Sequence, residues 1–177
     1  MIRALLVTAL LFSAQMALAF SYTVEIPEEE LQKKVSAMMP IEKKKLFVTV
    51  VLSKPEVDLM EGEDKIGVFS HIEVRVPGAA GLKGSGRVNI TGSLSYDAKK
   101  GAFFFHKPSI VRLEVDKIPG KYMKNVKKAV ELIAKKVLAT RPVYTLKDDN
   151  VKQKLAKSVL ETVSVKDQQL EVVLSVF

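Results

Sequence analysis

Few side chains in this sequence have the type and spacing needed for catalysis or for metal binding. The chain has no cysteine, and its two histidines, His71 and His106, fall on different predicted strands. A metal site requires several such ligands close together, so we interpret both histidines as strand residues that reach solvent. The spacing predicts no metal site and no cofactor.

A glycine-rich stretch, Gly81-Leu-Lys-Gly-Ser-Gly-Arg87, invites comparison with a phosphate-binding loop. The P-loop pattern ends in lysine followed by serine or threonine, whereas Arg87 and Val88 stand here. A strand, not a helix, is predicted to follow, so no helix N-terminus would face a phosphate. We interpret residues 77–86 as a flexible loop between strands.

No motif for nucleophilic catalysis is present. The sequence lacks the Gly-x-Ser-x-Gly pattern. The acidic residues at 61–64 fall in a predicted turn, and those at 28–30 suit the first turn of a helix, where the helix dipole favours negative charge. We therefore predict that the protein is not an enzyme.

A basic amphipathic helix, expected from about residue 119 to 140, is the strongest indication of function. Lysines border its apolar stripe on both sides. One interpretation is attachment to an anionic membrane surface. The other, which we favour, is docking on the protein's own sheet with the lysines in water, because the apolar face of that sheet needs a cover. The stripe consists of Tyr122, Val126, Val130, Ile133 and Val137.

A third interpretation combines a curved sheet with this helix. A groove between them could hold an apolar ligand, and three adjacent phenylalanines at 103–105 and a methionine would suit its wall. The same residues would serve equally well as solid core. The predicted lining residues are Phe103, Phe105, Met123, Val126, Val130, Ile133 and Val137.

The other elements follow from apolar periodicity. A strand is expected at 20–26 and a helix from Pro27 to Pro40, followed by a run of strands between 46 and 116. After the long helix, a short helix from Asp148 or Asp149 to Lys157 precedes two closing strands. Strands and helices do not alternate, so we predict an α+β fold with an antiparallel sheet packed on the long helix.

The first 19 residues have the pattern of a secretory signal peptide. Arg3 precedes an apolar run, and Ala17-Leu-Ala19 forms a cleavage site. We expect cleavage after Ala19, which leaves one domain, residues 20–177, in the periplasm. Because the chain has no cysteine, we expect no lipid anchor.

The formal net charge of +8 suits an anionic membrane surface or an acidic protein partner. Lysine-rich surfaces are also common without any partner. Arginines and aromatic residues are not interleaved as they are in nucleic-acid-binding proteins, so we expect no nucleic acid partner.

From residue 97 onward the chain resembles the YceB-like family of small bacterial envelope proteins. The matching pieces are Lys100-Gly-Ala-Phe-Phe-Phe105, the long helix, Arg141-Pro-Val-Tyr-Thr-Leu-Lys-Asp148, Lys154-Leu-Ala-Lys157 and the closing strands around Val163-Ser-Val165. The resemblance implies a strongly curved antiparallel sheet wrapped around one long helix, with short N-terminal and C-terminal helices, similar to half of a BPI-like (tubular lipid-binding) module. It implies no catalytic residues. Family members carry an N-terminal cysteine, where this chain has Phe20.

Together these observations predict a periplasmic carrier or binding module for a lipid-like apolar ligand, held between the long helix and the sheet. The alternative is a non-enzymatic envelope protein-interaction or assembly factor with a solid core.

Overall fold

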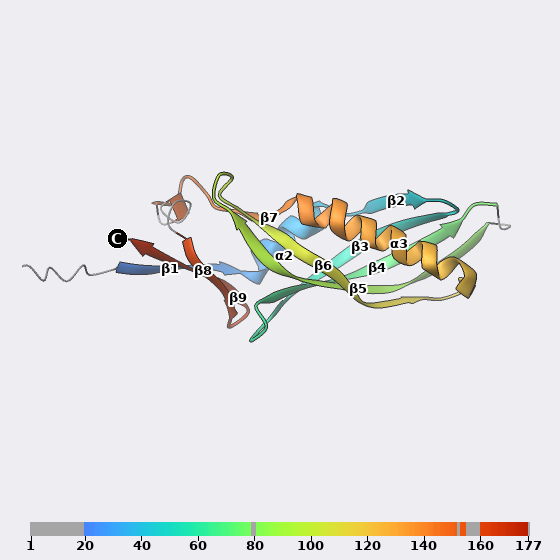
Figure 1. Ribbon diagram of the computed structural model, residues 1–177, viewed down its shortest axis with the longest axis horizontal. Coiled ribbons are helices and arrows are strands. Elements are labelled where there is room, and N and C mark those ends of the chain that lie inside the picture. The colour runs from blue at the N-terminus through green and yellow to red at the C-terminus, as the bar shows by residue number, and fades with distance from the viewer. Residues whose placement is uncertain (1–19, 79–80, 152, 155–159, 177) are drawn as a thin grey trace, which may run out of the picture.

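The computed structural model describes residues 20–78, 81–151, 153–154 and 160–176, and strands make up most of them. The predicted signal peptide, residues 1–19, lies outside this part. In chain order (Figure 1) the elements are β1 (Phe20–Pro27), α2 (Glu28–Ala37), β2 (Ile41–Lys45), β3 (Val48–Met60), β4 (Lys65–Val76), β5 (Leu82–Asp97), β6 (Ala102–Val115), α3 (Gly120–Lys136), the 3-10 turn η1 (Leu138–Thr140), β7 (Pro142–Thr145), β8 (Leu160–Lys166) and β9 (Gln169–Val176).

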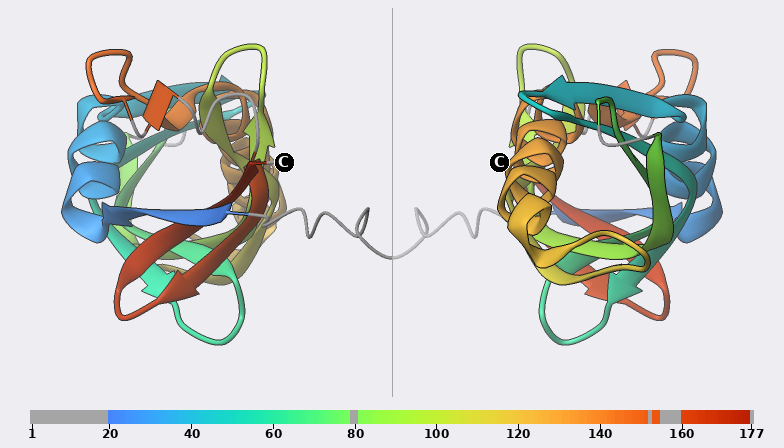
Figure 2. Two further views of the ribbon diagram at one scale, coloured as in Figure 1. Left: turned by 90° about the vertical axis from the view of Figure 1, so that its left-hand side faces the viewer. Right: turned by 90° about the vertical axis from the view of Figure 1, so that its right-hand side faces the viewer.

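Two antiparallel sheets build the molecule. The larger has the strand order β2-β3-β4-β5-β6-β7 and the smaller the order β1-β9-β8. Viewed along the long axis, the larger sheet curls into an incomplete tube (Figure 2). The smaller sheet and α2 lie at one end of that tube, where the N-terminal and C-terminal strands pair (Figure 1).

The residues of β4 alternate between the inner and the outer face of the curled sheet. Ile66, Val68, Ile72 and Val74 are buried, whereas the alternate positions from Phe69 to Arg75 are exposed or half-buried. Successive side chains of a strand point to opposite faces, so the apolar positions fill the inside of the tube. This division is the one that the sequence pattern predicts.

The predicted α+β architecture, with a sheet wrapped around one long helix, is wrong. The chain is mostly β-structure, and α3 is only 17 residues long, ending at Lys136. It contacts β2, β3 and β6 and fills the open side of the tube, so it forms part of the wall (Figure 2). A helix enclosed on all sides would have to be apolar all round, but the lysines of α3 are exposed.

The structure gives different outcomes for three other predicted elements. A short helix is present after Pro27 as α2, with the three acids Glu28, Glu29 and Glu30 in its first turn. Of the short C-terminal helix expected to end at Lys157, residues 152 and 155–157 lie outside the described residues, and residues 151, 153 and 154 are helical. The predicted loop at 77–86 is wrong in its second half, because residues 82–86 belong to β5.

Two glycines of that stretch allow neighbouring chain segments to pack closely in the sheet. A Cβ atom on Gly86 would collide with the main-chain oxygen of Glu114, and one on Gly84 would collide with that of Asp116. β5 and the chain at and just beyond the end of β6 therefore approach so closely that only glycine fits at these two positions. A glycine-rich sequence here reflects strand packing and not flexibility.

Helix α2 completes the hydrogen bonding of β3. β2 pairs with β3 only as far as Leu52, and beyond that point the same edge of β3 faces α2. Gln32 accepts a hydrogen bond from the Val57 amide (2.7 Å) and donates one to the Pro55 carbonyl (2.7 Å). Glu28 accepts one from the Leu59 amide at 2.8 Å. Side chains thus take the place of a neighbouring strand.

We expect the substitution Gln32→Ala to destabilise the fold by about 1–3 kcal/mol, because it leaves the Val57 amide and the Pro55 carbonyl without partners. Urea unfolding followed by circular dichroism measures this loss. Lys33→Ala, at an exposed position of the same helix, is the control and should change stability by less than about 0.5 kcal/mol. Equal effects of the two substitutions would show that Gln32 does not support the strand.

Among the described residues, no helix has both the length and the apolar character needed to span a bilayer.

Candidate functional site

The predicted ligand-lining residues lie in the main apolar core. Phe103, Val126, Val130 and Ile133 have no surface accessible to water, and Phe105 is 2% exposed. Met123 and Val137 are partly buried at the margin of the same cluster. The structure thus brings all seven residues into one cluster, but it leaves no water-sized space beside the four fully buried ones.

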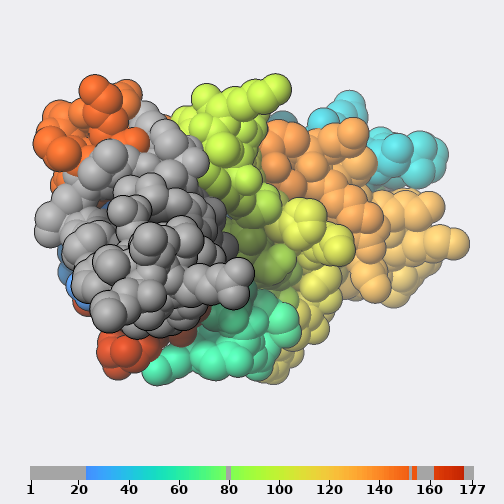
Figure 3. All heavy atoms as spheres, turned by 60° about the vertical axis from the view of Figure 1, so that its left-hand side comes forward, coloured from blue at the N-terminus to red at the C-terminus, as the bar shows by residue number. Residues whose placement is uncertain are grey.

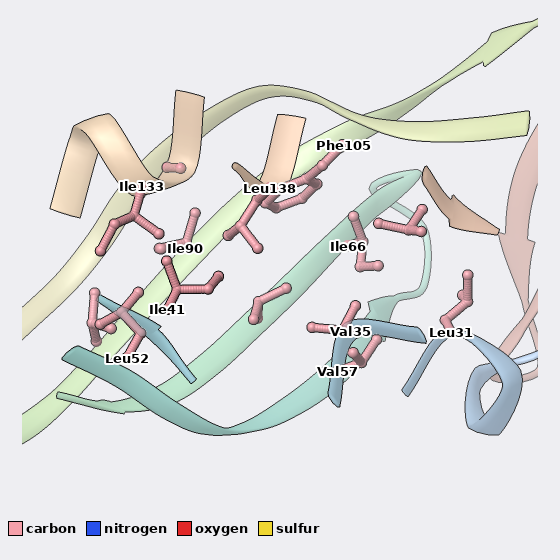
Figure 4. Close-up of a cluster of buried hydrophobic side chains, with 14 of the residues drawn as sticks. Leu31, Val35, Ile41, Leu52, Val57, Ile66, Ile90, Phe105, Ile133 and Leu138 are labelled. Atoms are coloured by element: carbon pink, nitrogen blue, oxygen red, sulfur yellow. The ribbon is translucent and has the colours of Figure 1, made fainter. Parts of the chain in front are cut away.

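The packing between α3 and the sheet is visible in Figure 4. Ile133 of α3 points toward Ile90 of β5 and toward Ile41 and Leu52 of β2 and β3, and all but the slightly exposed Ile41 are fully buried. Side chains from opposite walls of the tube therefore meet one another directly. This is the arrangement of a close-packed interior.

We expect Ile133→Ala to cost about 2–5 kcal/mol of stability, the range for removing a large apolar side chain from a solid core. Thermal and urea unfolding measure the loss, with exposed Lys135→Ala as the control on the same helix. A loss below about 1 kcal/mol would mean that Ile133 borders a hollow that its truncation merely enlarges.

A hollow of about 590 Å³ lies on the outer face of the curled sheet, away from these core residues. In Figure 3 this face is recessed along β5, between β6 and the hairpin that joins β3 to β4. Its size is within the range of ligand-binding pockets. We call it the outer-face hollow; its lining residues are Lys54, Glu56, Phe69, Ser70, His71, Arg87, Val88, Asn89, Arg112 and Glu114.

Strand register assembles this hollow in two rows across the sheet. One row runs from Glu56 through Phe69 and Asn89 to Arg112, and each residue is opposite the next on the neighbouring strand. A second row joins His71, Arg87 and Glu114. Ser70 and Val88 alternate with these positions and are buried, so their main chain forms the floor.

The lining of the outer-face hollow has three cations, Lys54, Arg87 and Arg112, and two carboxylates, Glu56 and Glu114. Arg112 forms an ion pair with Glu114 at 2.7 Å, and both side chains are largely exposed. Within the described part of the chain, Lys54 and Arg87 form no ion pair. An incoming carboxylate could therefore pair with them without displacing an internal partner.

Two local features distinguish the floor and rim of the hollow. The amide oxygen of Asn89 is buried and accepts no hydrogen bond from a described residue. Lys54 adopts a left-handed backbone conformation (φ 48°) at the bulge between Ser53 and Glu56. Such a conformation costs energy in a residue other than glycine, and bulges re-aim side chains at functional places in sheets.

A second, shallower hollow of about 380 Å³ adjoins the first, and His71 lines both. Its cations are Arg75, Lys83 and Lys117, and its carboxylate, that of Glu73, lies 3.9 Å from Arg75. The two hollows form a polar track along the outer face. Phe69, His71, Glu73 and Arg75 alternate along β4, so their shared face follows from the sequence, but the sequence carries no signal for the residues that meet them from β3, β5 and β6.

Metal-binding side chains do not cluster in the described part of the chain. No group of three or more histidine, cysteine or acidic side chains could hold a metal ion there. His71 lies opposite Arg87, whereas His106 lies opposite Ser93 toward the other end of the sheet. The two histidines therefore lie in different regions of the larger sheet.

Comparison with known proteins gives a family. The family model described as "Protein of unknown function (DUF1439)" matches residues 26–169. The chain belongs to this family. The matched region of the DUF1439 protein runs from the end of β1 to the start of β9 and so includes the whole curled sheet, both helices and the outer-face hollow. No curated protein matches the chain.

Proposed function

We propose that the protein is a non-enzymatic interaction module that binds an acidic segment of a partner protein along the outer face of the curled sheet. The observation that carries the proposal is the outer-face hollow, where Lys54 and Arg87 have no ion-pair partner among the described residues. Charge complementarity would direct the encounter and select acidic sequences.

The form of the polar track supports an extended ligand. Two adjoining hollows of about 590 and 380 Å³ share His71, and both open onto the surface. Their linings together contain six cationic side chains and three carboxylates, and this excess of positive charge suits a ligand rich in carboxylates. The exposed ring of Phe69 offers one apolar contact, and the buried amide oxygen of Asn89 would accept a hydrogen bond from a donor that reached the floor.

The cellular setting of this proposal comes from the sequence. The signal-peptide pattern of residues 1–19 and the resemblance to YceB-like proteins support export to the periplasm. The partner would then be an envelope protein with a glutamate- or aspartate-rich stretch.

A fluorescein-labelled decaglutamate peptide tests the proposal through fluorescence anisotropy at low ionic strength. We expect the double substitution Arg87→Ala with Lys83→Ala to weaken binding at least tenfold, about 1.4 kcal/mol, and added salt to weaken it further. The control is Lys33→Ala with Lys34→Ala, which removes the same charge from exposed positions on α2. Equal losses of peptide affinity in both double variants would show that binding depends only on the net charge of the protein, and would contradict the proposal.

A lipid-like ligand between α3 and the sheet is the second candidate. It is favoured by the partial burial of Met123 and Val137, which leaves two apolar side chains of α3 at the margin of the core. An apolar ligand entering there would have to separate Ile133 and Val130 from the opposite wall, because both are fully buried.

Native mass spectrometry of the protein purified from periplasm distinguishes the two candidates. A carrier retains an added mass that appears as lipid after denaturation. From the solid packing around Ile133 we expect the mass of the protein alone, unchanged after incubation with membrane phospholipids. A stoichiometric lipid adduct, lost in an Ile133→Phe variant that fills the interface, would favour the carrier instead.

A further inference from the structure

The hairpin turn between β2 and β3 exposes two large apolar side chains. Leu46 is 62% exposed and Phe47 is 66% exposed, and they are consecutive residues at the tip. No other pair of neighbouring large apolar residues in the described chain is exposed to this degree. Water gives no stabilisation to such a pair, so the tip suits an apolar surrounding outside the protein.

The turn also departs from the residues that two-residue hairpin turns prefer. Leu46 has a φ of 51°, in the left-handed region that glycine and asparagine occupy at low cost. A leucine there is strained by its Cβ and gains no packing in exchange, since most of its surface is exposed. Leu46 thus has an unfavourable backbone conformation without any gain in packing within the fold, which indicates that it binds something outside the protein.

Three lysines lie next to the tip. Lys43, Lys44 and Lys45 precede it directly on β2, and none of them forms an ion pair with a residue that the structure describes. An apolar tip behind a run of cations matches the interface of an anionic bilayer, where acyl chains lie beneath negative head groups.

The start of α3 adds charge at the same end of the molecule (Figures 1 and 2). Its first turn contains no acidic residue, whereas Lys117, Lys121 and Lys124 lie in or near it and are exposed. In α2, by contrast, three acids occupy the first turn. Cations at the positive end of a helix are unfavourable in isolation, and a negatively charged surface would relieve this repulsion.

We infer that the protein docks on anionic phospholipid bilayers through this end, with Leu46 and Phe47 inserted between the head groups and the neighbouring lysines above them. The occupant is the bilayer surface. This docking does not depend on the outer-face hollow, because Leu46, Phe47 and the lysines on β2 do not line it. Lys117, near the start of α3, also lines the second hollow.

Tryptophan fluorescence tests the insertion directly, because the chain contains no tryptophan. In Phe47→Trp, vesicles of phosphatidylglycerol and phosphatidylcholine should shift the emission maximum to the blue by about 10 nm or more, as expected when an indole leaves water for an apolar layer. In Val111→Trp, at a similarly exposed position on β6, the maximum should stay unchanged. Sedimentation of Phe47→Trp with the vesicles without a blue shift would overturn the inference.

Vesicle co-sedimentation measures the contributions of the two features. We expect Leu46→Ser with Phe47→Ser to lower the partition coefficient at least tenfold, and Lys44→Gln with Lys45→Gln to lower it about tenfold or more. Lys33→Gln with Lys34→Gln is the matched charge control, and circular dichroism checks that every variant is folded.

Failure of the wild type to sediment with the vesicles, or equal losses of binding in the two lysine pairs, would overturn the inference. Arg87→Ala should keep vesicle binding, which separates this result from the peptide test.

Discussion

The fold depends on how the edge of β3 is completed. Over its first half β3 pairs with β2, and over its second half its amides and carbonyl are bound by Gln32 and Glu28 of α2. An uncovered edge in the middle of the chain would leave main-chain groups unpaired and invite pairing with other molecules. The helix that prevents this also contacts β7, at the other edge of the curled sheet, and β1 of the smaller sheet, and so fixes the smaller sheet at one end of the tube.

The alternation of side chains along the strands gives the two faces of the larger sheet different roles. The inner positions are buried and stabilise the tube, and substitution of large residues there is costly. The outer positions carry charge and tolerate change, so binding surfaces can develop on them without loss of the core. Apart from the buried Ser70 and Val88 in the floor of the outer-face hollow, this hollow and the hairpin tip consist of side chains that lie outside the core.

The sequence predicted the elements better than their arrangement. The faces of β4, the helix α2 and the apolar stripe of α3 follow from periodicity and are present, because burial imposes the same period on structure and sequence. The central position of the long helix was wrong, since a stripe shows that a helix docks on something but not on which side of a sheet it lies.

Features that depend on contacts distant in sequence could not be predicted. Gly84 and Gly86 indicated a loop, whereas they are needed because the chain around the end of β6 approaches β5 there. The outer-face hollow requires the register of four strands, and bulges at Ser53/Glu56 and Asn89/Ile90 shift that register. Pro55 marks the first bulge in the sequence, but the second has no such signal, so residues such as Arg87 and Glu114 could not be placed side by side.

The position of α3 in the wall has a mechanical consequence. The tube is closed along one line by side chains alone, since no main-chain hydrogen bond among the described residues crosses from α3 to β2 or to β6. Apolar contacts are non-directional, and a seam made of them can slide or widen without breaking the ladder of any strand. We therefore expect the tube to resist bending along its strands and to widen more easily along the line where α3 contacts β2 and β6.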